Sequence, residues 1–132
     1  MRYQPASGVV ALPLRPEPAA VPEARELVQG VLRRWSCAEP VVDDALAVVS
    51  ELVTNAMLHT DGPIRLELRA TGRSIRVEII DASTAPPWRR WAGATEEHGR
   101  GLGIVATLAA AWGYHTRPDG KAVWAELRDP PG

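Results

Sequence analysis

The sequence predicts an α+β protein, a two-layer sandwich in which three helices cover one face of a mixed, mostly antiparallel sheet. Apolar residues recur at helical spacing over residues 24–59 and again over residues 102–112. Between these segments, residues 64–81 alternate apolar and charged side chains, as strands with one covered face do. The predicted chain order is β-α-α-β-β-loop-α-β-β.

An edge strand and a first helix are expected at the start of this order. The run GVVALPL, residues 8–14, includes Pro13, which cannot donate to a sheet ladder and therefore favours an edge position. The helix follows Pro22, with Arg25 and Glu26 on its solvent face. Its apolar positions are Ala24, Leu27, Val28, Val31, Leu32 and Trp35.

The second helix is expected to begin near Pro40 and to end near residue 60, at the sequence TDGP. It is apolar almost all round, so most of its faces should be covered. Within it, SELVTNAMLHT places Glu51, Asn55 and His59 four residues apart, on one stripe of the helix.

The remaining elements are a hairpin, a loop, a third helix and two short strands. The hairpin strands are expected over residues 64–70 and 74–81, and residues 82–98 form a long loop of the kind that is usually functional. The third helix lies in GRGLGIVATLAAAWG and stops at Gly113, and the strands YHTR and KAVWAEL flank the turn PDG. The hairpin's water-facing charges are Arg65, Glu67, Arg69, Arg76 and Glu78.

Length and composition predict a single domain over residues 1–132, with a short N-terminal tail and a proline-rich C-terminal tail. The net charge of −1 excludes a general basic surface for nucleic acid or anionic membranes. The single Cys37 excludes an internal disulfide framework, and no run has the pattern of a signal peptide or membrane span. We therefore expect a cytoplasmic protein that contacts neither nucleic acid nor membrane directly.

Glu51 and Asn55 are the first candidates for chemistry. Residues four apart are neighbours on a helix, so the carboxylate and the amide would present oxygens to a common point. Mg²⁺ accepts such an oxygen together with substrate phosphates, and a nearby carboxylate could orient or deprotonate an attacking hydroxyl or water. The alternative is that both side chains face solvent, or that Asn55 caps a local backbone group.

Two further candidates are the glycines of HGRGLGIV and the aspartate of VEIID. Gly99, Gly101 and Gly103 precede a helix, where backbone amides can approach an anion, although glycines there could equally permit close helix packing. No Gly-Lys-Ser/Thr follows, which excludes a Walker A loop. Asp81 ends a strand and could accept a hydrogen bond from an exocyclic amine, or could belong to an Asx turn.

The order of these pieces is more specific than any one of them. Glu-x-x-x-Asn on a buried helix, an aspartate after a hairpin strand, a long loop and Gly-x-Gly-x-Gly resemble the Bergerat-type ATP-binding fold of gyrase, histidine kinases and mismatch-repair ATPases. The segments SELVTNAMLH, VEIIDAST, GRGLGIVATLAAAWG and GKAVWAEL are more closely similar to stand-alone anti-sigma factor serine kinases of partner-switching systems and their actinobacterial relatives. The resemblance covers about residues 8–128.

The resemblance implies a role for each candidate. Glu51 would be the general base or water-orienting carboxylate, Asn55 the Mg²⁺ ligand, and Asp81 the acceptor for the adenine amine. Residues 84–98 would form a lid over ATP, and His59 would pack at the helix end without a chemical role. The phosphate-wrapping segment would comprise Gly99, Arg100, Gly101, Leu102 and Gly103.

The implied function is that of an anti-sigma factor that regulates transcription. It would sequester a sigma factor, and it would bind an anti-anti-sigma antagonist and phosphorylate it on serine with Mg-ATP. The resemblance also allows a homodimer, because such relatives are often dimers.

Two departures from the family pattern favour an alternative. Asp81 is followed by residues 82–85, ASTA, where the family has Asp-x-Gly-x-Gly, and residues 121–123, KAV, replace a threonine that often helps to bind the nucleotide. The alternative is a non-catalytic partner-switching module with weak or lost ATP binding. A third reading is the ATP-binding half of a split histidine kinase.

Overall fold

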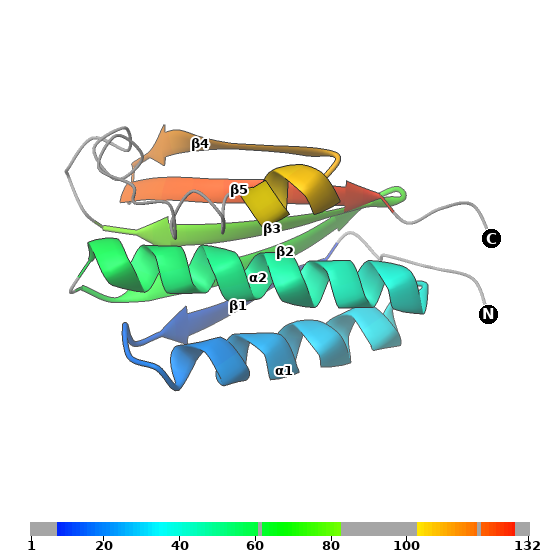
Figure 1. Ribbon diagram of the computed structural model, residues 1–132, viewed down its shortest axis with the longest axis horizontal. Coiled ribbons are helices and arrows are strands. Elements are labelled where there is room, and N and C mark those ends of the chain that lie inside the picture. Colours follow the sequence, from blue (N-terminus) through cyan, green and yellow to red (C-terminus); the bar gives the residue numbers. More distant parts are fainter. Residues whose placement is uncertain (1–7, 61, 83–102, 119, 129–132) are drawn as a thin grey trace.

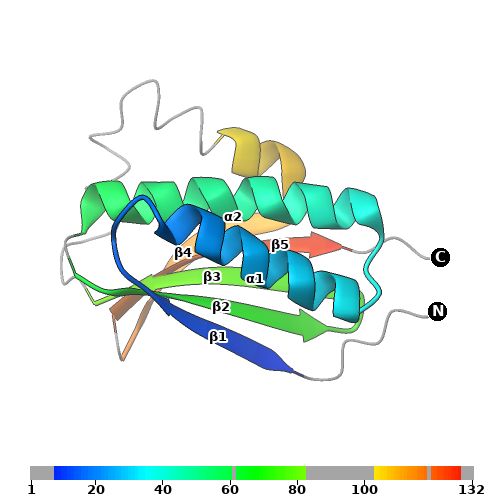
Figure 2. The same cartoon turned by 90° about the horizontal axis from the view of Figure 1, so that it is seen from below.

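The computed structural model describes residues 8–60, 62–82, 103–118 and 120–128. Its elements are β1 (Val9–Leu14), α1 (Ala20–Arg34), α2 (Glu39–His59), β2 (Ile64–Thr71), β3 (Ser74–Asp81), a short helix at 103–108, β4 (Ala111–Arg117) and β5 (Gly120–Arg128). Figure 1 shows the strands in one sheet, and Figure 2 shows the helices on one side of it. The predicted α+β sandwich is confirmed.

The sheet has five strands in the order β1-β2-β3-β5-β4, so β1 is an edge strand as predicted from Pro13. All its pairings are antiparallel, and no parallel pair occurs among the described strands. The sheet is therefore antiparallel rather than mixed. The hairpins β2–β3 and β4–β5 pair along their length, and β5 joins them by pairing with β3.

The helix α2 lies beside α1 on the same face of the sheet and contacts α1, β3 and β5, which explains its almost uniformly apolar sequence. Pro40 lies in its first turn and His59 ends it, close to the predicted bounds. Its buried apolar side chains are Val41, Val42, Ala45, Leu46, Val48, Val49, Leu52, Val53 and Ala56. They pack against inward-facing strand residues, which include Leu66, Leu68, Ile75, Val77, Ile79, Val123, Ala125 and Leu127.

The helix α1 is fixed to α2 by a polar contact as well as by apolar packing. Nη1 of Arg25 donates to Oγ of Ser50 at 2.6 Å and to the carbonyl of Leu46 at 3.1 Å. Arg25 is exposed, as the sequence pattern predicts, and its guanidinium also bridges the two helices. Because Ser50 immediately precedes Glu51, this contact also fixes the part of α2 that carries the candidate site.

The third helix ends earlier than predicted. Its described part covers residues 103–108 and does not continue to Gly113, because Trp112 and Gly113 lie in β4. The amide of Ala110 already joins the ladder to β5, with a hydrogen bond of 2.8 Å. Gly113 does not end a helix but makes room for an indole, since a Cβ there would lie 3.2 Å from Cζ2 of Trp124.

The open face of the sheet carries two buried carboxylates. The alternation pattern predicts Glu67 and Glu78 in water, yet they are only 9% and 8% exposed. They lie directly opposite each other on β2 and β3, and Nη1 of Arg117 donates to Glu67 at 3.2 Å and to Glu78 at 3.0 Å. Arg65 also donates to Glu67 at 2.9 Å, and Arg76 to Glu78 at 2.8 Å. The arginines cover both carboxylates, which explains the departure from the pattern.

Candidate functional site

Glu51 and Asn55 lie on a half-buried stripe of α2, which also includes Asp44 and Ala47. The other faces of the helix carry apolar side chains that pack in the core. Four residues correspond to about 6 Å along a helix axis, so the two side chains start one turn apart on the same side. Both side chains are half-buried, so they do not simply face solvent.

Asp81 is the last residue of β3 and is only 2% exposed. Side chains two residues apart on a strand share a face, so Asp81 lies on the same face as Val77 and Ile79, which pack in the core. That face is the one covered by α2. Figure 1 shows the arrowhead of β3 at the same end of the molecule as the C-terminal half of α2. The fold therefore brings Asp81 to the side of the sheet that carries Glu51 and Asn55.

The backbone around Asp81 is closely packed against the start of β5. Gly120, the first residue of β5, has φ +140°, a conformation that L side chains rarely adopt. A Cβ at this position would clash with the carbonyl oxygen of Asp81 and lie 2.9 Å from Cα of Ala82. Only a glycine lets β5 begin this close to the end of β3, so Gly120 helps to fix Asp81.

Lys121 lies next to a candidate site residue, although the sequence analysis gave it no role of its own. It pairs directly with Asp81 in the register of β3 and β5, and it is only 5% exposed. The pattern could have identified it, because counting back in steps of two from Ala125 and Val123 places Lys121 on the core face. The strand KAVWAEL thus places the buried amine of Lys121 opposite Asp81, the residue expected to bind the adenine amine.

The glycine segment is described in part. Gly103 begins the described helix 103–108, and its carbonyl accepts a hydrogen bond from Oγ1 of Thr107 at 2.8 Å. A Cβ at Gly103 would meet no described atom within 4 Å, so close packing does not explain this glycine within the described residues. The loop 84–98 and the predicted residues Gly99, Arg100, Gly101 and Leu102 lie outside the described residues, as does the side chain of His59.

The described residues contain no group of three or more His, Cys, Asp or Glu that could hold a metal ion by themselves. Asn55 and Glu51 offer one amide oxygen and one carboxylate from adjacent turns of α2. This donor set fits Mg²⁺, which commonly takes one or two protein oxygens and completes its shell with phosphates and water.

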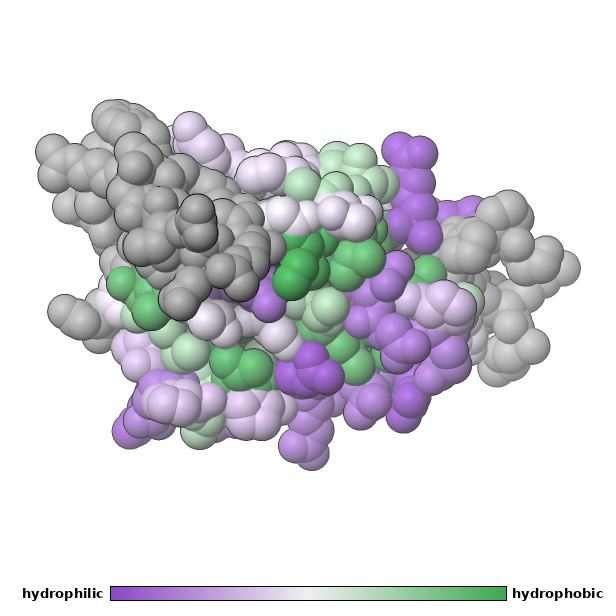
Figure 3. Space-filling model, in the orientation of Figure 1, coloured by the Kyte–Doolittle hydropathy of each residue, from purple (hydrophilic) through white to green (hydrophobic). Residues whose placement is uncertain are grey.

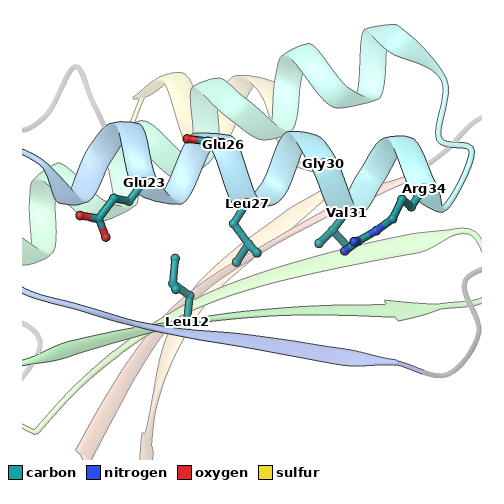
Figure 4. Close-up of a pocket in the computed structure, with 7 residues that line it drawn as sticks. All are labelled: Leu12, Glu23, Glu26, Leu27, Gly30, Val31 and Arg34. Atoms are coloured by element: carbon teal, nitrogen blue, oxygen red, sulfur yellow. The ribbon is translucent and has the colours of Figure 1, made fainter.

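A groove of about 430 Å³ lies elsewhere, between α1 and the edge strand β1. In Figure 4, Leu27 and Val31 of α1 point toward Leu12 of β1, and the charged lining residues come from α1. None of the described candidate residues lines it. On the helix side, Figure 3 shows several hydrophobic areas with hydrophilic residues between them, and Leu58 and Ile104 are exposed apolar residues. No described helix is long and apolar enough to span a membrane.

Comparisons with known proteins agree with this architecture. The family model of the histidine kinase-like ATPase domain matches residues 14–127. No curated protein matches the chain. A solved structure with a similar fold is that of the RsbU and RsbW domains of Rv1364c from Mycobacterium tuberculosis, with 19% sequence identity and a TM-score of 0.70. The match covers 92% of this chain and 32% of that one, so this chain spans about a third of that chain's length.

Proposed function

Because the chain belongs to the histidine kinase-like ATPase domain family, we propose that it binds Mg-ATP and acts as an anti-sigma factor of the serine-kinase type. It sequesters a sigma factor in the cytoplasm. It also binds an anti-anti-sigma antagonist and transfers the γ-phosphoryl group of ATP to a serine of that protein. The proposed function thus requires two protein partners and one nucleotide.

One observation carries the proposal. The family match extends over residues 14–127 and includes Glu51 and Asn55 of α2 and Asp81 of β3, and α2 covers the face of the sheet that carries Asp81. The likeness of fold to a structure that contains an RsbW domain supports the partner-switching class among the members of this family.

Each described residue has a proposed task. Asp81 accepts a hydrogen bond from the exocyclic amine of adenine. Asn55 contributes its amide oxygen to Mg²⁺, which when bound would neutralise charge on the phosphates. Glu51 orients the serine hydroxyl and accepts its proton as the oxygen bonds to the γ-phosphorus and ADP leaves. The remaining proposed contacts come from the lid, residues 84–98, and the glycine segment, residues 99–103.

The test begins with binding and ends with phosphotransfer. Calorimetry with ATP and Mg²⁺ should give a binding signal, and a pull-down from the native host should recover a sigma factor and an antagonist. Glu51→Ala should keep ATP binding but lower phosphotransfer to the recovered antagonist by about 10²–10⁴-fold. Asp43→Ala, which removes an exposed carboxylate of the same helix, is the matched control and should transfer at the parental rate. Equal rates for Glu51→Ala and the parent would refute the assignment of Glu51.

A second candidate function is a partner-switching module without kinase activity. The observation in its favour is the sequence after Asp81, where residues 82–85 lack the glycines of the family's adenine motif. The same calorimetry separates the two functions. Binding of the protein partners with no heat from millimolar Mg-ATP would establish the second function and exclude the first.

A further inference from the structure

We infer that Lys121 is the counter-ion of Asp81 and a positioning residue for recognition of the base, an inference that rests on the proposed function. The two residues face each other at the last pair of the β3–β5 ladder. Residues directly opposite each other in an antiparallel pair have Cβ atoms about 4.5–5.5 Å apart and point to the same face. The register therefore brings a carboxylate and an amine within reach of each other.

Burial makes this pairing an energetic requirement. Asp81 is 2% exposed and Lys121 is 5% exposed, so neither charge can rely on water. An isolated buried charge is strongly unfavourable, whereas two opposite charges compensate each other. Lys121 has a second direct neighbour, Thr116 of β4, but that side chain carries no charge. Of its two cross-strand neighbours, only Asp81 can balance the ammonium.

The identity of the residue supports a local role. Lys121 is the single lysine of the chain, and every other basic side chain apart from histidine is an arginine. An ammonium is a compact point charge on a flexible stem, which suits one carboxylate in a confined place. The arginines of the open face, in contrast, contact Glu67 and Glu78 on the side of the sheet that α2 does not cover.

The pair leaves Asp81 able to act on a ligand. An ionised carboxylate has two oxygens with about four acceptor sites, so it can accept from Lys121 and from an exocyclic amine at the same time. Lys121 would keep the carboxylate ionised and oriented, and Gly120 fixes its backbone. Lys121 thus acts through Asp81, and it supports the selectivity of that carboxylate for a 6-amino purine over a 6-oxo purine.

The experiment compares binding of Mg-ATP and Mg-ITP, which differ at the exocyclic position that Asp81 would read. The parent should prefer ATP. Lys121→Met keeps the length of the side chain without its charge, and it should reduce the ATP preference by about tenfold through weaker ATP binding. Its affinity for ITP should stay within about twofold of the parental value. Lys121→Arg should retain the preference, and Arg128→Met, which removes an exposed cation of the same strand, is the matched control.

An ATP preference that is unchanged or increased in Lys121→Met would overturn the inference. The pair can also be judged without a nucleotide, by comparing urea midpoints of Asp81→Asn, Lys121→Met and the double variant. Coupling predicts that the double variant is more stable than Lys121→Met, because the uncompensated carboxylate is then gone. Additive losses would overturn the pairing. Failure of the parent to bind either nucleotide would refute the proposed function instead, and the unfolding cycle would still decide the pairing.

Discussion

On the open face of the sheet, Glu78 of β3 lies directly opposite Glu67 of β2, whereas on the helix-covered face Asp81 lies directly opposite Lys121 of β5. The first pair has like charges and would repel, so it depends on a third residue, Arg117, that donates to both. The second pair has opposite charges in adjacent strands. The same strand thus buries carboxylates in two ways, a few residues apart.

The difference reflects what surrounds each face. Within the described residues, the open face is covered by its own long side chains, and Cζ of Arg76 lies 4.2 Å from the ring centroid of Trp124. Several arginines donate hydrogen bonds to the two carboxylates there, so each carboxylate keeps a partner when one contact is lost. The helix-covered face is packed with aliphatic side chains, which leaves few positions for a charge. A charge that is kept on that face is therefore a better indication of a ligand site than one on the open face.

The largest expected effect tests whether the helix-covered face carries the stability. Leu66 of β2 is fully buried between the sheet and the helices. Leu66→Ala should therefore lower the free energy of unfolding by about 2–5 kcal/mol. Arg69→Ala, at an exposed position of the open face of the same strand, should change it by less than about 1 kcal/mol. Urea denaturation followed by circular dichroism measures both. Equal losses would mean that the two faces do not differ in this way.

The next effect tests the open face itself. Arg117→Met removes the donor shared by Glu67 and Glu78 and leaves two like charges facing each other, so it should destabilise the protein by about 1–2 kcal/mol. Adding Glu78→Gln should restore part of the loss, because the repulsion then disappears. Arg33→Met is the matched control, since the Arg33–Glu39 pair is exposed to solvent. Its midpoint should equal that of the parent, and an equal loss in both arginine variants would refute the bridging role.

The sequence predicted the fold well because the patterns that define it are local. Periodicity placed α1, α2 and both strands of the β2–β3 hairpin within a few residues, and Pro13 correctly indicated an edge strand. The predicted end of the third helix was wrong, since Trp112 fits both the helical spacing before it and the alternation with Tyr114 in β4, which pairs with β5. Periodicity alone cannot decide between helix and strand when a partner strand is available.

The sequence motifs nominate Glu51, Asn55 and Asp81 as candidate site residues, but they do not give the arrangement of these residues. In the fold, α2 covers the face of the sheet that carries Asp81. The pairing of Lys121 with Asp81 depends on the β3–β5 register, which joins segments about 40 residues apart. The burial of Glu67 and Glu78 depends in the same way on Arg117, which comes from β4. The register between strands that are far apart in the sequence cannot be predicted from a local sequence pattern.

The smallest expected effect is the pH dependence of the open-face network. Burial by itself raises the pKa of Glu67, but the hydrogen bonds and charges of Arg117 and Arg65 outweigh it and hold that pKa below its ordinary value of 4.5. A carboxyl whose pKa is lower in the folded state stabilises that state when ionised. This contribution is complete above pH 4.5, and it is lost as the pH falls below 4.5 through the lowered pKa.

The measurement compares urea midpoints of the parent and Glu67→Gln from neutral to acidic pH. The parent should be the more stable at pH 7, and the difference should shrink below pH 4.5, because the parental Glu67 then becomes neutral like the glutamine. Other carboxyl groups titrate in both proteins and largely cancel in the difference. Glu67→Gln in the Arg117→Met background should show a smaller difference throughout, since the main donor is absent. A difference that stays constant from neutral to acidic pH would show that Glu67 contributes by packing rather than by its charge.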